Sequence, residues 1–177
     1  MVTGNRLGAG LLFGFAIAAV GPALAGRDTV ATQTPAPNAC ALLTADEVHS
    51  LAPKEAVSSG VASVSQAVEA TSCHYTWGTG VNRFMLAVSL DTAARAYAGM
   101  SSEAIRQQFQ SSVVPQTMDA TVPEVGDAAI FKAYSPAYAA ASAYAKNHIV
   151  KVSIDGVDAP ARKGDLVTLL KAAVGRL

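Results

Sequence analysis

Two cysteines are the residues of this chain whose chemistry is most readily assigned. Cys40 and Cys73 are its only thiols, and their spacing fits neither a zinc knuckle nor a Cys-x-x-Cys redox motif. Two such thiols form a structural bridge in an oxidising compartment, whereas the cytosol keeps them reduced. We therefore predict a Cys40–Cys73 disulfide for an exported chain, with two free thiols as the alternative.

Three histidines, His49, His74 and His148, are the other candidates for catalysis or metal binding. No two of them have a zinc-ligand spacing such as His-x-x-x-His, and no Glu-x-x-His helix motif is present. The serines lie in no Gly-x-Ser-x-Gly elbow. The sequence therefore predicts no catalytic residue, no metal ligand and no cofactor. The alternative is a site in which folding assembles a histidine, a serine and a carboxylate.

The N-terminal segment has the pattern of an export signal. Arg6 precedes an apolar stretch over Leu7–Val20, and Gly21-Pro22 interrupts it before Ala23-Leu24-Ala25, a typical signal peptidase site. The pattern predicts a signal peptide over 1–25, a flexible leader over 26–39 and a single domain over 40–177. The protein would then be periplasmic or secreted. An uncleaved anchor is the alternative, because 7–26 is an uncharged stretch long enough to span a bilayer.

The charge balance argues against nucleic acid as a partner. The chain has 13 Lys and Arg residues and 13 Asp and Glu residues, and its formal net charge is zero. Arg6 is the only charged side chain in 1–25, so removal of that segment leaves a net charge near −1. Such a chain has no basic excess to neutralise phosphates. No later stretch could span a membrane, so the partner classes left are an envelope or extracellular protein and a small ligand.

A dense helix-start signal opens the predicted domain. Thr44 can cap a helix and Glu47 can reach back to it, which is the capping-box arrangement, and Leu43 and Val48 stand at the positions of a hydrophobic staple. Pro53 predicts an end near Ala52. Asp46 and Glu47 therefore have a structural explanation, and neither is assigned a catalytic role.

Alternating apolar residues predict the strands. Phe84 to Leu90 alternates as a half-buried strand does, and Cys73, Tyr75 and Trp77 share one face of the strand before it. A weaker strand is predicted over Val61–Val68. The second half is predicted to hold a helix from Asp91 or Thr92 to Phe109 that Gly99 and Ser101-Ser102 interrupt, a loop over 116–124, strands at Ala128–Lys132, Tyr138–Ala145 and His148–Ile154, and a final helix over 166–177.

This order, α-βββα-βββα, predicts an α+β domain with an antiparallel sheet of about six strands and helices on one face. The other face would then meet solvent or a partner. By strand alternation, the open face carries Met85, Ala87, Ser89, Ile149, Lys151 and Ser153.

Three short motifs resemble a broad group of secreted bacterial domains, many of them lipoproteins of unknown function. Residues 40–48 read CALLTADEV and match the opening Cys-x-Leu-Leu-Thr-x-x-Glu-Val of that group. A second cysteine precedes Tyr and Trp in Cys73-His-Tyr-Thr-Trp, and a Gly-Asp-x-Ala turn follows at Gly126. The resemblance implies an α+β domain with a disulfide and implies no reaction and no ligand. The chain departs from the group because no cysteine stands at the cleavage point for lipidation.

The sequence points to two tyrosines and one lysine as a possible binding surface. Tyr134 and Tyr138 flank Ser135-Pro136, and the sequence favours their partial burial at the sheet edge, with an exposed loop of the kind common in recognition surfaces as the alternative. Lys151 would lie on the open sheet face. We therefore predict an exported, non-catalytic binding or sensor-like domain that uses these three residues. The alternatives are a small periplasmic hydrolase, or a structural subunit of an envelope complex with a large apolar patch on its open face.

Overall fold

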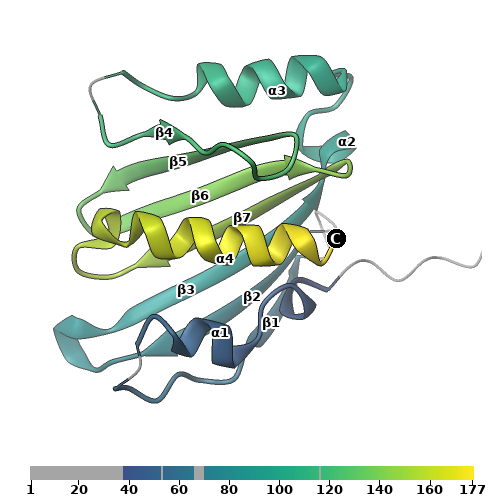
Figure 1. Cartoon of the computed structure of the whole chain (residues 1–177). Helices are drawn as coiled ribbons and strands as arrows, with labels where there is room; N and C mark the ends of the chain where they lie inside the picture. The colour runs from purple at the N-terminus through teal and green to yellow at the C-terminus, as the bar shows by residue number, and fades with distance from the viewer. Residues whose placement is uncertain (1–37, 53, 66–69, 116) are drawn as a thin grey trace, which may run out of the picture. The chain divides into compact units, whose positions relative to one another are not determined.

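The computed structural model describes residues 38–52, 54–65, 70–115 and 117–177 (Figure 1). The predicted signal peptide, and all of the predicted leader except Asn38 and Ala39, lie outside these residues. The helices, including 3-10 turns labelled η, and the strands follow in the order η1 (Ala39–Ala41), α1 (Ala45–His49), β1 (Val61–Ser65), β2 (Ala70–Trp77), η2 (Gly80–Asn82), β3 (Phe84–Thr92), α2 (Ala93–Ala96), α3 (Ser102–Ser111), β4 (Ala120–Thr121), β5 (Ala128–Ser135), β6 (Tyr138–Ala145), β7 (His148–Asp155), η3 (Ala159–Arg162) and α4 (Lys163–Gly175).

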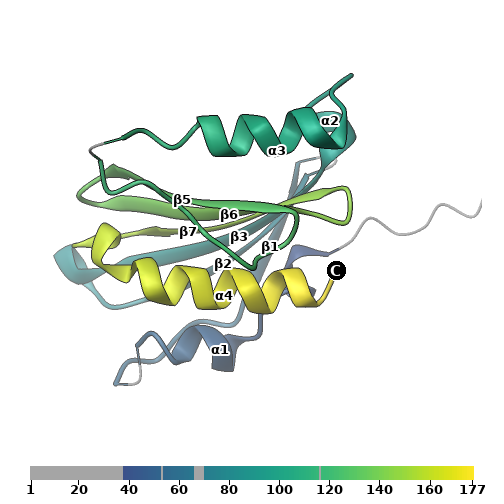
Figure 2. The same cartoon turned by 45° about the horizontal axis from the view of Figure 1, so that its top comes forward.

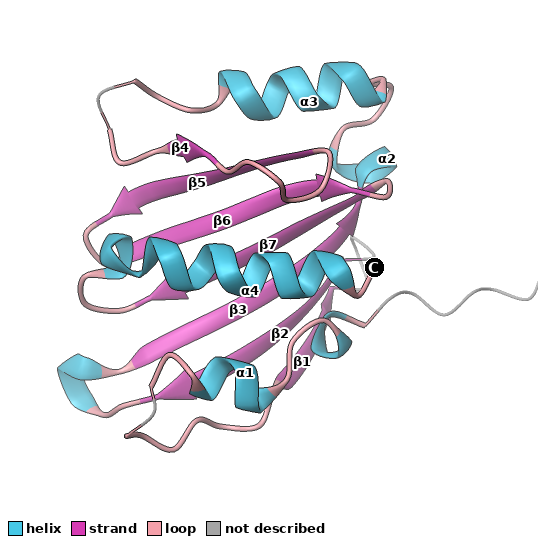
Figure 3. Cartoon of the chain, in the orientation of Figure 1, coloured by secondary structure: helices cyan, strands magenta, loops and turns pink. Residues whose placement is uncertain are grey.

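The described strands form one antiparallel sheet in the order β1-β2-β3-β7-β6-β5-β4 (Figure 3). The predicted α+β class and antiparallel sheet are confirmed. The central pair is β3 and β7, with Val88 opposite Val152, so the first three strands and the last four meet along one ladder. The seventh strand, β4, lies where a loop was predicted. Its two residues pair with Phe131 and Ile130, and a strand of that length leaves no alternating pattern to recognise.

One face of the sheet, here called the α4 face, carries the main core. Leu166, Leu169 and Leu170 of α4 pack over the second half of the sheet, where β6 presents Ala139, Ala141 and Ala143. Small side chains on β6 let the helix approach the sheet closely. The segment from η1 to α1 covers β2 and β3 on this same face, as Figure 1 shows. The predicted apolar stripe of the final helix is confirmed.

The opposite face, here called the α3 face, is covered as well, so the prediction that all helices lie on one face is wrong. Figure 2 shows α3 above the sheet and α4 below it. Ile105 and Phe109 of α3 pack against Ile130 and Tyr144 of the sheet. The physical reason is that β5, β6 and β7 carry apolar side chains on both faces near these positions. Along β3, buried and more exposed residues alternate regularly. The prediction assumed the same alternation for β5, β6 and β7, which bury residues on both faces.

The segment from η1 to α1 is held to the α4 face by a disulfide, a hydrogen bond and an ion pair. The predicted Cys40–Cys73 disulfide is confirmed, and the hydroxyl of buried Tyr75 donates to the carbonyl oxygen of Leu43 at 2.6 Å. The predicted capping box is also confirmed: the Glu47 amide donates to the Thr44 hydroxyl at 3.3 Å, and the Thr44 amide donates to the Glu47 carboxylate at 2.8 Å. A contact that sequence spacing does not reveal joins Arg176, after α4, to Glu47 at 2.7 Å.

Turn residues explain the second half of the sheet. Lys146 and Asn147 join β6 to β7 with positive φ angles of 46° and 62°, as a two-residue hairpin of this twist requires. Gly126, in the Gly-Asp-x-Ala turn, has a φ of 61° and lies so close to β6 that a Cβ would stand 2.6 Å from the Tyr144 carbonyl oxygen. The predicted interruption between α2 and α3 is confirmed, and Ser101 caps α3 through the Ala104 amide at 3.2 Å.

No helix in the described part of the chain is both long enough and apolar enough to cross a membrane.

Candidate functional site

The three residues predicted to form a binding surface lie together on the α3 face. The ring centroids of Tyr134 and Tyr138 are 5.3 Å apart. The Lys151 ammonium lies 5.6 Å from the Tyr134 centroid and 5.3 Å from the Tyr138 centroid. These distances are those of cation–π contacts, so the two rings hold the lysine in place. Residues far apart in the sequence therefore make one surface.

The tyrosines belong to strands, so the alternative of an exposed loop is not what the structure has. Tyr134 is in β5 and Tyr138 opens β6, and only Pro136 and Ala137 form the turn between them. A register shift between Ala133 and Ser135 interrupts the ladder here and marks a bulge. The bulge leaves the Tyr134 side chain 56% exposed while Tyr138 is half-buried. The favoured expectation of partial burial holds for Tyr138, but at the end of an interior strand and not at a sheet edge.

A cavity of about 250 Å³ adjoins this surface, between α3 and the sheet. Phe109 of α3 faces Ile130 of β5 and Ile149 of β7 across it, and these three side chains form its apolar part. The other lining residues carry polar groups and come from the C-cap of α2, from α3 and its C-cap, and from β5, β6 and β7: Tyr97, Gln108, Ser112, Lys132, Tyr134, Ser142 and Lys151. The cavity is therefore apolar on part of its wall and polar on the rest.

Several polar side chains of this cavity have no internal partner. Among the residues that the structure describes, none donates to or accepts a hydrogen bond from the side chains of Tyr97, Gln108, Tyr134, Ser142 and Lys151. The hydroxyl of Tyr144, by contrast, donates to Ser102 at 2.9 Å beside the start of α3. Polar groups that lack an internal partner must bind water or a ligand. Five of them around one cavity make it the strongest candidate for a binding site.

The two lysines of the cavity differ in their surroundings. Lys132 donates to the carbonyl oxygen of Ser112 at 2.8 Å and lies 3.8 Å from the carboxylate of Asp119, whose side chain is 5% exposed. Lys151 has no carboxylate within ion-pair distance in the described part of the chain. The site therefore holds one cation without a counter-charge. Nearby, burial and then the charge of Tyr134 raise the pKa of Tyr97, so its hydroxyl stays protonated at neutral pH.

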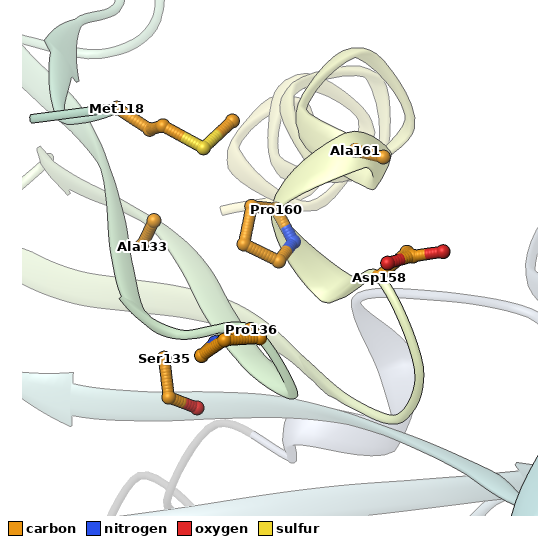
Figure 4. Close-up of a pocket in the computed structure, with 7 residues that line it drawn as sticks. All are labelled: Met118, Ala133, Ser135, Pro136, Asp158, Pro160 and Ala161. Carbon is orange, nitrogen blue, oxygen red and sulfur yellow. The ribbon is translucent and has the colours of Figure 1, made fainter.

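A second cavity, larger and more open, lies at the C-terminal end of β5 on the α4 face (Figure 4). Its volume is about 510 Å³, and Met118, Ala133, Pro136 and Pro160 form most of its wall. Asp158 points away from the other lining residues in Figure 4. The Ser135 hydroxyl accepts from the Ala137 amide at 3.2 Å. This cavity offers apolar contact and few free polar groups, so it has less means of selecting a ligand.

The histidines do not form one site. His49 is at the end of α1 and exposed, and His148 contacts the Lys146 carbonyl oxygen at 2.8 Å. The ring Nε2 of His74 lies 3.1 Å from the Ser72 hydroxyl and 3.3 Å from the Ser63 hydroxyl. Its Nδ1 is buried and, among the described residues, has no hydrogen-bond partner. A serine and a histidine therefore meet on the α3 face, over β1 and β2, but no carboxylate orients the ring.

The described residues contain no group of three or more His, Cys, Asp and Glu side chains placed to hold a metal ion.

The residues predicted for the open face do share one face of the sheet, but not all of them are open to solvent. Register places Ala87 opposite Ser153 and Ser89 opposite Lys151, so these residues share the α3 face. Met85 is 42% exposed. Ile149, however, packs beside α3, because that helix covers the ends of β5, β6 and β7. In the described part of the chain, α3 leaves uncovered the half of this face that β1, β2 and β3 form (Figure 2).

Sequence reasoning missed five polar residues of the cavity, one of which, Ser112, lies beyond the last residue named for the predicted helix. Lys132 and Ser142 fall in predicted strands, and Tyr97 and Gln108 fall in the predicted helical segment, but no local pattern distinguished them. Strand phase was the available signal, since Ser142 pairs directly with Lys151 and with Ile130. The placement of α3 over these strands could not be read from the phase alone.

The fold and the site together define a class of protein, a disulfide-linked α+β domain with a part-polar cavity between one helix and its antiparallel sheet. No family model, no curated protein and no solved structure matches this chain.

Proposed function

We propose that this protein is an exported, non-catalytic binding domain, and that its ligand seats against Tyr134, Tyr138 and Lys151 and the adjoining cavity. One observation carries the proposal: a cation without a counter-charge, held by two tyrosine rings, stands beside a cavity with five unpartnered polar side chains. A surface of this kind recognises a ligand through aromatic contact and a few placed polar groups. The lysine is already oriented, which reduces the entropy lost on binding.

The location of the protein is part of the same proposal. A disulfide that ties the first helix to β2 supports an oxidising compartment, periplasmic or extracellular. Cleavage after Ala25 would give a protein that begins at Gly26. The intact mass of the protein recovered outside the cytoplasm tests this, and a mass that includes 1–25 would contradict cleavage.

Of the two partner classes, the cavity favours a small ligand over a protein. A protein partner would rest on the exposed rings and the uncovered half of the α3 face, whereas the cavity lies beneath α3. The formal net charge of zero gives no support to a nucleic acid.

The test compares what the immobilised protein retains from an extract of its own cell envelope, analysed by mass spectrometry for both small molecules and proteins. The wild-type protein is compared with a Tyr138→Ala, Lys151→Glu double variant. We expect at least one component that the wild-type protein retains and the double variant does not.

The matched control is Met118→Ala, which changes the second cavity and leaves the proposed site intact. This variant should retain the same component as the wild-type protein. If the double variant and the wild-type protein retain identical sets, or if only Met118→Ala loses the component, the proposed site is wrong.

One observation favours a second candidate, the small periplasmic hydrolase. Ser72 lies 3.1 Å from a ring nitrogen of His74, which is the contact of a nucleophile with its base. The orienting group of such a site is not among the described residues, because the other ring nitrogen has no partner. A fluorophosphonate that labels the wild-type protein but not a Ser72→Ala variant would establish this alternative over the non-catalytic proposal.

The third candidate, a structural subunit of an envelope complex, requires a large apolar patch on the uncovered face. The described side chains there are mostly small or polar: Ser63, Ser72, His74, Thr76, Ala87 and Ser89. Val61 and Met85 are the exposed apolar residues among the described positions of that half. This composition does not favour a permanent interface.

A further inference from the structure

We propose that the cavity between α3 and the sheet binds a small amphipathic carboxylate, with its apolar body among Phe109, Ile130 and Ile149 and its carboxylate at Lys151. This inference rests on the proposed function, and it adds the chemical class of the ligand. Three properties of the cavity carry it: the volume, the charge and the arrangement of free donors.

The volume sets the size of the ligand. A cavity of about 250 Å³ has the bulk of about eight liquid water molecules, and an enclosed apolar cavity of about 150 Å³ already admits benzene. The space therefore suits one aromatic ring, or a short alkyl chain, together with a small polar group. A polysaccharide or a folded protein segment is too large to enter it.

The charge sets the sign of the polar group. Lys132 and Lys151 both lie near the exposed Tyr134 ring, at 5.8 and 5.6 Å from its centroid. The charge of Lys132 is offset by Asp119 at 3.8 Å. Lys151 has no such acid among the described residues, so the local charge of the lining is positive by one unit. A ligand with one negative charge completes the balance, whereas a cationic ligand would be repelled.

The free donors set the geometry around that negative group. Ser142 lies directly opposite Lys151 on the neighbouring strand, and its hydroxyl has no partner among the described residues. The Tyr97 hydroxyl, in the same lining, is a further donor. An ammonium and neutral hydroxyls that line one cavity can bind both oxygens of a carboxylate, and hydrogen bonds that involve a charge are the stronger kind.

The apolar and polar parts of the lining also give the ligand a direction. Phe109 and Ile130 are 3% and 8% exposed, and they belong to the packed cluster under α3. Tyr134, beside Lys151, is 56% exposed. The apolar end of the ligand therefore enters under α3, and its carboxylate stays near the mouth, where Lys151 stands over the two rings.

The test uses 3-phenylpropionate as the probe and 3-phenylpropanamide as its neutral match, added to the protein as the cell exports it. Binding is followed through the amide signals of the 15N-labelled protein. We expect the acid to shift the signals of Phe109, Ser142 and Lys151. We expect the amide to bind about tenfold more weakly, as the loss of one charged hydrogen bond implies.

Two variants separate charge from space. Lys151→Met should bind the acid and the amide equally, because it removes the charge and keeps the side-chain length. Ser142→Ile should weaken both compounds, since it fills the floor of the cavity with a side chain that suits a strand. Lys171→Met is the control: Lys171 is on α4, 3.8 Å from Glu124, and its loss should leave the preference for the acid unchanged.

The inference is overturned if neither compound shifts these signals, if the shifts lie elsewhere, or if acid and amide bind equally to the wild-type protein. It is also overturned if Lys151→Met keeps the preference for the acid. None of these results decides the proposed function, which has its own test. A component of the envelope extract that the wild-type protein retains and the Tyr138→Ala, Lys151→Glu double variant does not can be a neutral or a large molecule. If the acid does not bind and the Tyr138→Ala, Lys151→Glu double variant also retains the same envelope components as the wild-type protein, the binding site itself is rejected.

Discussion

The two faces of the sheet differ in how completely they are closed. On the α4 face, Leu166, Leu169 and Leu170 of α4 and the segment before α1 cover both halves of the sheet. On the α3 face, α3 contributes Ile105 and Phe109 and covers part of one half. Both helices pack on the same sheet, so the difference in cover comes from the longer apolar stripe of α4 and the shorter one of α3. A short stripe holds α3 at one end of the strands and leaves polar groups beside it without partners.

This contrast indicates where stability and binding are separated in the molecule. The α4 face contains the disulfide, the buried Tyr75 hydroxyl and the ion pair of Glu47 with Arg176. The α3 face contains the cation without a counter-charge and the unpartnered polar side chains. Polar groups without a protein partner remain open to water or to a ligand, so the α3 face is the one suited to binding.

The largest expected difference comes from removing a phenylalanine on each face. Phe131 is fully buried in the main core, and Phe131→Ala should cost about 4–5 kcal/mol of unfolding free energy. Phe109→Ala should cost about 3 kcal/mol, because its smaller cluster lies beside a cavity into which neighbours can relax. Denaturant titration of both variants measures this. Equal losses would mean that the α3 face is packed as tightly as the α4 face.

Removal of the disulfide should give the next largest loss of stability. The bridge closes a loop with a sequence separation of 33, and replacement of Cys40 and Cys73 by alanine should lower the unfolding free energy by about 3–4 kcal/mol. The fold should survive, because much of the effect is on the unfolded chain. Circular dichroism and thermal melting give the readout. A melting temperature equal to that of the wild-type protein would show that the bridge contributes nothing.

The ion pair of α1 with the end of α4 should make stability depend on acid pH. Hydrogen bonding from Arg176, followed by the Thr44 amide and hydroxyl, lowers the pKa of Glu47 from 4.5 to about 2, against the opposing effect of burial. A lowered pKa stabilises the folded state above pH 4.5, and this contribution is lost as the pH falls from about 4.5 to about 2.

The variant that tests this dependence is Glu47→Gln. It should be less stable than the wild-type protein by about 1–2 kcal/mol at neutral pH, allowing for solvent screening. The difference should shrink toward pH 2, as measured by unfolding titrations at several pH values. A difference that does not change with pH would show that the carboxylate charge is not the cause.

The capping box offers a smaller effect. Thr44→Ala should cost about 1 kcal/mol, because the Glu47 amide loses its partner. Taken alone, the sequence predicts a smaller loss for Glu47→Ala than for Thr44→Ala, and the contact with Arg176 reverses that order. The double variant should lose less than the sum of the two single losses, since the two residues cap each other. Additive losses in denaturant titration would mean that the box is not reciprocal.

The smallest stability effects should come from the proposed site. Tyr138→Ala and Lys151→Glu change side chains that are half-exposed and make no hydrogen bond among the described residues. Each should alter the unfolding free energy by at most about 0.5 kcal/mol while it abolishes retention of the envelope ligand. If both variants unfold, the cluster is structural, and the contrast between the two faces fails.

Much of the fold follows from local sequence patterns. The capping box at Thr44 and Glu47, the alternation of Phe84 to Leu90 and the hairpin turn at Lys146-Asn147 were all predicted and are confirmed. The Cys40–Cys73 bridge was predicted from the pattern of an exported chain. Each of these features depends on neighbours in the chain or on a pair with no competing partner, so the sequence contains the necessary information.

The site shows where local patterns stop being sufficient. Tyr134, Tyr138 and Lys151 were predicted as a surface, and the structure brings them together. The cavity beside them was not predicted, because it depends on which face α3 covers. Ile105 and Phe109 could pack on either face of a sheet, and the choice was made by Ile130, Tyr144 and Ile149, which come from three strands.

The sequence alone determined most of the element types, the strand phase and the disulfide, and it nominated the three residues of the proposed surface. Only the tertiary structure decided the central pairing of β3 with β7, the position of α3, the contact of Arg176 with Glu47 and the cavity. The physical reason is the distance along the chain over which each interaction acts. Caps, turns and alternation act over a few residues, whereas the cavity requires one helix and three strands to meet, and that meeting minimises exposed apolar area over the whole domain.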